Sequence, residues 1–330
     1  MPKYLVTGGA GFIGSHIVEE LVRRKSGVRV FVNLSTGSKN NLAPFQGQIE
    51  FLKGDLRDLS QVRKAVKGVS HIFHAAALRA VARSVEHPLE TDEVNVRGTL
   101  NLLMAARDAR VKRVVYSSSS SVYGESRKFP LREDDTPGPV SPYAASKLMG
   151  EYYCKIFSNL YGLQTVSLRY FNVFGPRQNP KSKYSAVIPL FIDALLSGES
   201  PEIHWDGRQS RDFSYIDNVV EANMLAAKVA RADGEVFNVA CHEEHSVLEV
   251  FNGIKKILNV PHVEPRFLPR RAGDVRRTLA DITKAKKILG FKVMTRFYEG
   301  LEKTVNWLVE SGALGGRKAK VQGVSQSRFS

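Results

Sequence analysis

Three glycines near the start of the chain limit its fold more than any other feature. Gly8, Gly11 and Gly14 lie between the apolar run YLVT (4–7) and the amphipathic pattern FIGSHIVEELVRR (12–24). Glycines at this position permit a tight turn, close approach of the backbone to a pyrophosphate, and close packing of a helix on a strand. The helix N-terminus then faces the phosphates. The pattern predicts a dinucleotide-binding βα unit, although its spacing differs from the usual Gly-x-Gly-x-x-Gly, and a tight turn without a ligand is the competing interpretation.

The N-terminal half repeats this alternation of strand and helix. Short apolar runs occur at VRVFV, IEFLKG, HIFHAAA and RVVYSSSS, which predicts an α/β fold with a Rossmann-type, doubly wound parallel sheet. After about residue 175 the rhythm breaks, and the regular segments expected there are a strand at 237–240 and helices near 247–258, 282–289 and 296–311. We expect a smaller C-terminal α/β substrate-binding domain. The expected divisions are residues 1–174 for the NAD-binding domain, to which later segments return, 175–313 mainly for the substrate domain, and 314–330 for a disordered basic tail.

The formal net charge of +15 raises the question of a nucleic-acid partner. Aromatic side chains are not interleaved with the basic runs, as a stacking platform for single strands requires. A basic surface also suits anionic nucleotides, so we expect neither a nucleic-acid nor a membrane partner. No apolar run reaches the ~18 residues that a membrane span needs. Two cysteines without a spacing motif and a start without the layout of a signal peptide favour a reducing cytoplasm.

A tyrosine and a lysine four residues apart form the candidate catalytic pair. In SPYAASKLMGE, Pro142 suits the first position of a helix, and Tyr143 and Lys147 then share one face of it. An ammonium group near the phenol lowers the tyrosine pKa from about 10 and makes it a usable base for a hydroxyl proton. Taken alone, the pair is better explained as an exposed Tyr and Lys on an ordinary helix. The glycine loop upstream favours the catalytic interpretation.

Over residues 2–311 the chain resembles the nucleotide-sugar epimerase/dehydratase family of extended short-chain dehydrogenases/reductases. The motifs that carry the resemblance occur in the family's order: TGGAGFIGSH, GDLRD, HAAALRAVARSVEHP, NVRGTLNLL, SSSSSVYGE, SPYAASK, LRYFNVFGPRQNP, RDFSYIDNVV and RRAGDVRRTLADITKA. Within the family, the likeness is greatest to the 4-epimerases of UDP-glucose and UDP-N-acetylglucosamine. The resemblance implies NAD as cofactor, no metal, a UDP-sugar substrate, and a homodimer formed through helices near 92–108 and 142–160.

The resemblance also assigns roles to residues by their position in these motifs. Ser119 hydrogen-bonds the sugar hydroxyl, Tyr143 is the base, and Lys147 is its electrostatic partner. The implied NAD contacts are Gly8, Gly11, Phe12, Ile13, Gly14, Asn33, Ser35, Thr36, Gly37, Asp55, Leu56, Ala75, Ala76, Ala77, Arg79, Asn95, Tyr143, Lys147 and Tyr170. The implied substrate contacts are Arg79, Ser84, Ser119, Tyr143, Asn172, Val187, Arg211, Arg271, Asp274 and Thr278. Taken singly, an arginine such as Arg211 is equally explained as solvated surface charge.

The residues after Ser119 bear on the type of reaction. Dehydratases and decarboxylases of the family usually place acidic residues there, whereas Ser120 and Ser121 follow in this chain. The resemblance therefore favours 4-epimerisation through a transient 4-keto sugar, with no net redox change. The alternatives are another enzyme of the family, such as a UDP-glucuronate 4-epimerase, a dehydratase or a net reductase. A non-catalytic sensor is the remaining alternative, and it would be expected to lose Ser119, Tyr143 or Lys147.

Two positions depart from, or vary within, the family pattern. In the family a bulky tyrosine at the position of Thr278 tends to exclude an N-acetyl group, so we expect N-acetylated sugars to be accepted here. At the position of Val32 the family usually has an aspartate that accepts hydrogen bonds from the adenosine ribose. A hydrogen bond to a charged group contributes roughly 1.5–3 kcal/mol. We therefore expect weaker NAD binding and less discrimination against NADP, with Asn33, Ser35 and Thr36 as the remaining polar groups.

Overall fold

The computed structural model describes residues 3–179, 186–270 and 275–311. Within these ranges its centre is a seven-stranded parallel sheet in the order β11-β6-β5-β4-β1-β2-β3. The strands are β1 (Tyr4–Thr7), β2 (Val28–Val32), β3 (Ile49–Lys53), β4 (His71–His74), β5 (Arg113–Ser119), β6 (Gln164–Tyr170) and β11 (Glu235–Val239). The expected doubly wound sheet is confirmed. Its strand order reverses at β1 and β4, and ligands of such sheets bind at this switch point.

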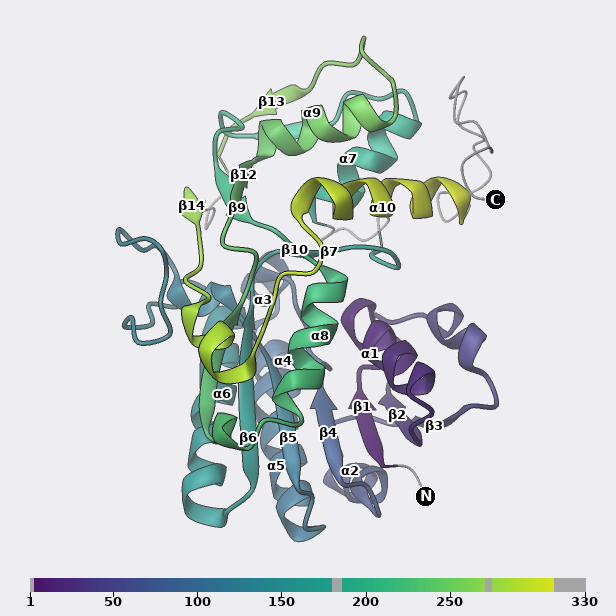
Figure 1. The fold of residues 1–330 in the computed structure, drawn as a ribbon, viewed down its shortest axis with the longest axis vertical. Coiled ribbons are helices and arrows are strands. Elements are labelled where there is room, and N and C mark those ends of the chain that lie inside the picture. The colour runs from purple at the N-terminus through teal and green to yellow at the C-terminus, as the bar shows by residue number, and fades with distance from the viewer. Residues whose placement is uncertain (1–2, 180–185, 271–274, 312–330) are drawn as a thin grey trace.

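Helices cover both faces of the sheet because both faces are apolar. Leu5 and Val6 are consecutive in β1 and fully buried, yet they belong to separate hydrophobic clusters, since successive strand side chains point to opposite faces. One face is covered by α1 (Phe12–Arg23) and α8 (Ile216–Ala226), and the other by α2 (Leu59–Val66), α5 (Gly98–Asp108) and α6 (Pro142–Tyr161) (Figure 1).

Short helical segments fill the connections between these elements. Between β4 and α5 the chain forms three of them, which pack beside α6: α3 (Val81–Glu86), α4 (Pro88–Asp92) and η2 (Glu93–Arg97). The others are η1 (Lys39–Phe45), η3 (Ser120–Tyr123), η4 (Ala230–Ala232) and η5 (Ala285–Leu289). No helix in the described ranges is both long and apolar enough to cross a bilayer.

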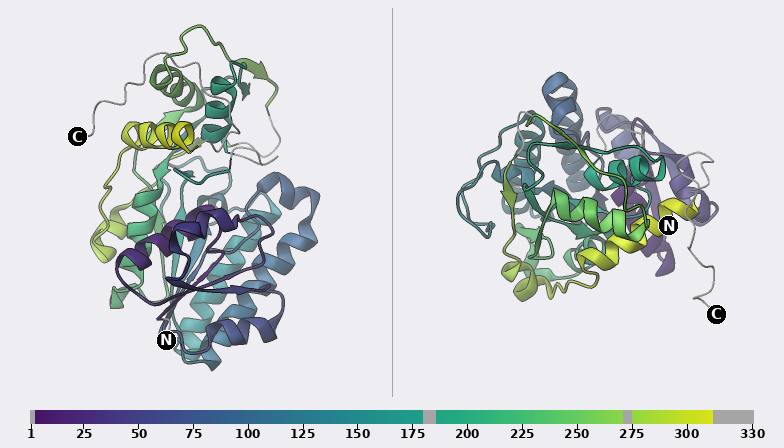
Figure 2. Two further views of the ribbon diagram at one scale, coloured as in Figure 1. Left: turned by 90° about the vertical axis from the view of Figure 1, so that its right-hand side faces the viewer. Right: turned by 90° about the horizontal axis from the view of Figure 1, so that it is seen from above.

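A smaller part of the chain lies beyond the carboxyl ends of the sheet strands (Figures 1 and 2). Its helices are α7 (Val187–Leu196), α9 (Val247–Ile257) and α10 (Phe297–Glu310). Its short strands are β7 (Val173–Phe174), β8 (Glu202–His204), β9 (Ser210–Asp212), β10 (Ser214–Tyr215), β12 (Glu244–Ser246), β13 (Arg266–Leu268) and β14 (Arg277–Thr278). Because β11 and α8 return to the large sheet, the chain passes between the two parts several times. The division at residue 174 stays a prediction, and the expected tail lies outside the described residues.

Candidate active site

A cavity of about 1720 Å³ lies at the carboxyl ends of the strands, with walls from both parts of the molecule. It is lined by all three predicted catalytic residues, Ser119, Tyr143 and Lys147. The other predicted residues that line it are Gly8, Gly11, Phe12, Ile13, Gly14, Asn33, Ser35, Thr36, Gly37, Asp55, Leu56, Ala75, Ala76, Ala77, Arg79, Tyr170, Asn172, Arg211 and Thr278. The fold thus gathers around one space most of the residues that the motifs assigned to NAD and to the sugar nucleotide.

The glycine loop forms one wall, and its backbone explains the glycines. Gly8 has φ 69°, which glycine adopts without strain, and a Cβ there would lie 2.8 Å from the Ala76 backbone. A Cβ on Gly14 would overlap the Gly8 carbonyl oxygen. Gly11 is the N-cap of α1, and no side chain caps that helix, so N–H groups of its first turn are left for a ligand. This cradle fits the diphosphate of a dinucleotide.

The predicted catalytic side chains come from β5 and α6. Ser119 is the last residue of β5, and α6 begins at Pro142 as expected. Tyr143 and Lys147 are one turn apart on α6, so both face the cavity. The Lys147 Nζ lies 6.0 Å from the centre of the Tyr143 ring and donates a hydrogen bond of 2.7 Å to the Ser117 carbonyl oxygen. The lysine is therefore held by the backbone of the strand that ends in Ser119.

The electrostatics of the pair differ from the sequence expectation. Burial raises the pKa of Tyr143, opposed by the hydrogen bond with Ser119 and by the positive charge of Arg79. Burial also lowers the pKa of Lys147 to about 8. The expected lowering of the tyrosine pKa by Lys147 is thus not found in this structure, because removing the phenolate from water outweighs the nearby groups that favour it. The groups that lower the pKa of Tyr143 against the effect of burial are Ser119 and Arg79, not Lys147.

Behind the catalytic side chains lies a buried ion pair that sequence reasoning missed. Arg169 on β6 donates hydrogen bonds of 2.9 and 2.8 Å to the two carboxylate oxygens of Glu151 on α6. The Ser118 hydroxyl donates a third, at 2.5 Å, and the guanidinium stacks 4.6 Å from the centre of the Tyr123 ring. This pair joins α6 to β5 and β6. A signal was present in the sequence, since Glu151 follows Tyr143 by two helical turns and shares its face.

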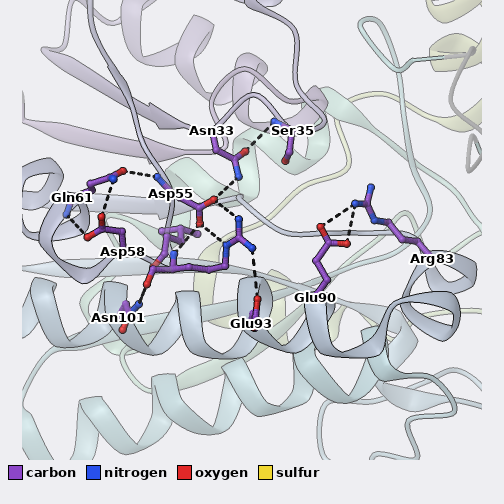
Figure 3. A network of polar contacts seen from close by, with 11 residues as sticks. Asn33, Ser35, Asp55, Asp58, Gln61, Arg83, Glu90, Glu93 and Asn101 are labelled. Atoms are coloured by element: carbon purple, nitrogen blue, oxygen red, sulfur yellow. Dashed lines mark hydrogen bonds and ion pairs between the residues drawn. The ribbon is translucent and has the colours of Figure 1, made fainter.

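The end of the cavity predicted to hold adenosine, called the adenosine end below, contains a more exposed polar network (Figure 3). Val32 ends β2 with a side chain only 6% exposed, and the next residue, Asn33, provides the polar group. The Asn33 Nδ2 donates to the Asp55 carboxylate at 3.0 Å, and its Oδ1 accepts the Ser35 N–H at 3.0 Å. The Arg57 guanidinium holds the pKa of the Asp55 carboxyl well below its usual range. The network keeps Asp55 charged and fixes the orientation of the Asn33 amide.

The substrate end is built by residues of the smaller part and of the segment after β6. Asn172 donates from Nδ2 to Thr278 Oγ1 at 3.3 Å. Thr278 pairs in register with Arg211 across β14 and β9, and the Arg211 guanidinium donates to the Ser210 carbonyl at 2.8 Å. Two further predicted contacts, Arg271 and Asp274, lie outside the described residues. Asn172, Arg211 and Thr278 therefore form one hydrogen-bonded wall.

Three predicted contacts do not line the cavity. Asn95 is buried and exchanges hydrogen bonds with the Leu78 backbone, accepting at 2.8 Å and donating at 3.0 Å. Ser84 is also buried and donates to the Val81 carbonyl at 2.6 Å. Val187 begins α7 next to the lining residue Ala186. Since Leu78 and Val81 do line the cavity, Asn95 and Ser84 support its wall from behind rather than face its interior.

The wall also contains residues that sequence reasoning did not select. Arg83 lines the cavity and pairs with Glu90 at 3.0 Å (Figure 3). Arg177 lines it too and donates to His16 Nδ1 at 2.8 Å, which docks its loop on α1. Both arginines occur in motifs quoted above, HAAALRAVARSVEHP and GPRQNP, so a signal was available. Nothing comparable marks Trp307, which reaches the cavity from α10.

Comparison with known proteins agrees with this site. Residues 4–240 match the family described as NAD dependent epimerase/dehydratase family. The UDP-glucose 4-epimerase of Mycolicibacterium smegmatis is 40% identical over 314 residues, covering 92% of this chain and 98% of that protein.

Two solved structures are similar with a TM-score of 0.89 each. One is the UDP-N-acetylglucosamine 4-epimerase of Methanobrevibacter ruminantium M1 in complex with UDP-N-acetylmuramic acid, at 42% identity over 94% of this chain and 99% of that one. The other is the UDP-glucose 4-epimerase of Thermotoga maritima with UDP-glucose, at 38% identity over 93% and 99%. With its glycine cradle and its Ser119–Tyr143–Lys147 wall, the chain belongs to the NAD-dependent epimerase/dehydratase family.

Proposed function

We propose that the protein is an NAD-dependent 4-epimerase of UDP-hexoses. The observation that carries the proposal is the position of Ser119, Tyr143 and Lys147 in a cavity that also contains the glycine cradle. The relatives compared above, at 38–42% identity, are 4-epimerases of UDP-glucose or UDP-N-acetylglucosamine. The proposed substrates are therefore the UDP-glucose/UDP-galactose pair and the UDP-N-acetylglucosamine/UDP-N-acetylgalactosamine pair.

Each catalytic side chain has a defined task in this reaction. The glycine cradle and the Asn33–Asp55 network would hold NAD, which would supply the hydride acceptor and donor for the sugar C4. Tyr143 removes the O4 proton as C4 is oxidised and gives it back when the 4-keto sugar is reduced. Ser119 orients the O4 hydroxyl toward Tyr143. The hydrogen bond with Ser119 and the charge of Arg79 favour the phenolate form of Tyr143. We assign a second, weaker supporting role to the Lys147 ammonium, 6.0 Å from the centre of the ring.

Inversion at C4 requires the sugar to turn while its nucleotide stays bound. Asn172 and Arg211 line the same cavity as the glycine cradle, and we assign them to the UDP diphosphate. Once O4 has lost its proton, the 4-keto sugar no longer donates a hydrogen bond to Tyr143, and it is free to rotate between these two anchors. After this rotation the opposite face of C4 would be turned toward the cofactor side of the cavity.

The acidic residues of the cavity favour epimerisation over dehydration. Within the described residues, the carboxylates that line it are Glu19, Asp55 and Asp217, and none of them is near Ser119 in the chain. The side chain closest after Ser119 is a hydroxyl: the Ser121 Oγ donates to the Ser119 Oγ at 2.9 Å. A 4,6-dehydratase needs a further acid and base for C5 and C6, and this wall supplies neither next to Ser119.

The direct test is incubation of the purified protein with a panel of UDP-sugars, followed by NMR of the sugar anomeric protons. We expect each accepted sugar to reach an epimer equilibrium without added NAD(P)H being consumed. A 4-keto-6-deoxy product would identify a dehydratase, steady consumption of NADPH a reductase, and turnover of UDP-glucuronate alone the uronate epimerase. No reaction with any sugar would overturn the proposal.

We further propose that the pocket accepts N-acetylated sugars. Thr278 is 8% exposed and its hydroxyl is bonded to Asn172, so a small side chain occupies this part of the wall. Thr278→Tyr should lower kcat/KM for UDP-N-acetylglucosamine far more than for UDP-glucose. Wild-type protein that is inert toward UDP-N-acetylglucosamine but rapid with UDP-glucose contradicts this assignment.

We also propose a cytoplasmic homodimer, with buried thiols at Cys154 and Cys241 as expected for a reducing compartment. The outer face of α6 carries an apolar stripe, and neighbouring α3 and α4 extend it. Its members are Val85, Leu89, Met149, Tyr152, Ile156 and Leu160, all 42–81% exposed. An apolar patch of this kind fits a self-complementary contact. Ile156→Glu should shift the protein to a monomer in light scattering, and an unchanged mass would remove α6 from the interface.

A further inference from the structure

The turn between β8 and β9 contains a tryptophan in a backbone conformation that disfavours it. Trp205 has φ 68°, a left-handed value that a bulky residue adopts only at a conformational cost. Its N–H donates to the Leu268 carbonyl at 2.8 Å, which fixes it to the end of β13. Glycine would adopt the same backbone without strain. The indole side chain must therefore make contacts that offset this cost.

Two arginines stack on the indole. The guanidinium carbons of Arg270 and Arg276 lie 4.4 and 4.6 Å from the ring centroid of Trp205, within the range of cation–π attraction. Each guanidinium also has a carboxylate partner. Arg270 donates to Glu125 at 2.9 Å, and Arg276 donates to both oxygens of Asp206 at 2.7 and 2.9 Å. With an aromatic face and a carboxylate each, the two side chains are held in place.

Arg276 connects this cluster directly to the substrate end of the cavity. Its carbonyl oxygen accepts the Ser210 N–H at 3.0 Å, immediately before the pairing of β9 with β14. In that pairing Thr278 lies opposite Arg211, and both side chains line the cavity. A displacement of Arg276 therefore moves Thr278 relative to Arg211.

Arg270 connects the cluster to the segment of chain that follows Ser119. Its partner is Glu125. The preceding residue, Gly124, lines the cavity and follows η3, the short helix that comes directly after Ser119. Through the two stacked arginines, the indole of Trp205 thus links the segment that follows β5 to the smaller part of the molecule. Its contacts are with arginines that already have acidic partners, so the cluster is built to hold structure together rather than to bind a free anion.

We propose that Trp205 is a positioning residue for the nucleotide half of the substrate. By holding Arg276, whose backbone pairs with β9 at Ser210, it keeps the neighbouring Arg211 in place for the UDP diphosphate. The inference rests on the proposed function, because Arg211 is assigned to a UDP-sugar. It predicts that the indole contributes to the affinity for UDP and not to the chemical step.

The test separates nucleotide affinity from fold stability by using Trp205→Gly. The glycine removes the indole and also relieves the positive φ, so we expect no large fall in the melting temperature. The dissociation constant for UDP, measured by calorimetry, should rise about fivefold to tenfold. KM for UDP-glucose should rise by the same factor, while kcat and the dissociation constant for NAD stay within about twofold.

Two further variants complete the experiment. Trp205→Phe keeps an aromatic face and should recover part of the UDP affinity. Phe267→Ala removes another aromatic side chain, 53% exposed on the adjacent β13, and should leave the affinity for UDP unchanged. Trp205→Gly with wild-type UDP affinity, or with NAD affinity and kcat reduced by the same factor as UDP affinity, overturns the positioning role. Wild-type protein that fails to bind UDP overturns the proposed function instead, so the two failures are distinct.

Discussion

Two arginine–carboxylate pairs, one behind the catalytic side chains and one at the other end of the cavity, have the same N–O distance of 2.8 Å but differ in their exposure to water. At the catalytic end, Arg169 and Glu151 are 4% and 3% exposed. At the adenosine end, Arg57 and Asp55 are 43% and 24% exposed. Breaking a buried pair leaves an uncompensated charge out of water, whereas an exposed pair contributes little because water and salt screen it. Although the two ion pairs have the same N–O distance, we therefore expect mutation of the buried pair to destabilise the protein more than mutation of the exposed pair.

The comparison extends to the groups that we propose for catalysis and for cofactor binding. The catalytic end presents Ser119, Tyr143 and Lys147 from a strand and a helix that are locked together by the buried pair. The adenosine end presents Asn33 and Asp55 from loops. A preorganised end tolerates little change, and a solvated end tolerates substitution because alternative hydrogen-bond partners, including water, are available.

The largest effect is expected from removing the phenol hydroxyl at the catalytic end. Tyr143→Phe should lower kcat about 10²- to 10⁴-fold, the usual contribution of a positioned acid–base group. UDP binding should stay within a few-fold, because the hydroxyl acts in the chemical step. Steady-state kinetics and calorimetry measure the two. A variant that keeps a tenth of the wild-type rate would remove Tyr143 from the role of base.

The next effect concerns pH and Lys147. Its pKa in the folded protein, about 8, lies below the ordinary value of 10.5, so its charge is lost as the pH rises through 8. If the ammonium supports Tyr143, kcat/KM should fall above that pH. The unfolded chain keeps the proton up to about pH 10.4, so this group's contribution to the free energy of unfolding increases between these two values. Lys147→Met should be much slower at neutral pH, with residual activity that rises with pH. A wild-type kcat/KM that stays constant up to pH 10 would contradict the assignment.

The two ion pairs can be compared directly. Glu151→Gln should lower the free energy of unfolding by about 3–5 kcal/mol, because it leaves Arg169 buried without a charged partner. Arg57→Gln, at the exposed pair, should lower it by less than about 1 kcal/mol. Urea denaturation of the two variants measures both. Equal losses of unfolding free energy in the two variants would mean that burial does not make the Arg169–Glu151 pair more important for stability than the Arg57–Asp55 pair.

The smallest effect is expected at Val32. Val32→Asp adds a carboxylate beside the Asn33–Asp55 network, and it should tighten NAD several-fold and disfavour NADP. The gain falls short of the roughly 1.5–3 kcal/mol of a full charged hydrogen bond, because position 32 is almost buried and an acid there loses hydration. Calorimetry on protein stripped of cofactor tests it. An unchanged affinity for NAD would mean that Asn33 and Asp55 already hold the ribose.

Sequence patterns predicted most of the sheet and the catalytic face because both depend on local spacing. The glycines at 8, 11 and 14, the helix start at Pro142 and the strand β11 near 237–240 are all found in the structure. Helix ends differ by a residue or so, as with α10 at Phe297–Glu310 against the expected 296–311. The helix expected at 282–289 begins at Thr283, whose N–H donates to the Asp281 carboxylate, and it continues as a π-helical turn over Ala285–Leu289.

The rest could not be predicted, because it depends on contacts between distant residues or on burial. The Trp205 cluster joins positions 205, 270 and 276, and no local pattern links them. The direction of the Tyr143 pKa depends on how deeply the phenol is buried, which the Tyr–Lys spacing does not reveal. The apolar positions of α6 are periodic whether they face the core or the solvent, so the exposed stripe became visible only in three dimensions.

Helix α6 has a consequence for how the activity depends on the amount of protein. Its 20 residues span about 30 Å, with Tyr143 and Lys147 on its first turns and the exposed stripe beginning at Met149. In the proposed dimer, a partner subunit that covers the stripe also stabilises α6, the helix that carries Tyr143. Dilution below the dissociation constant of the dimer would then lower the turnover rate per subunit, because a monomer lacks the partner that stabilises α6. A cell that made twice as much of this protein in that range would gain more than twice the flux.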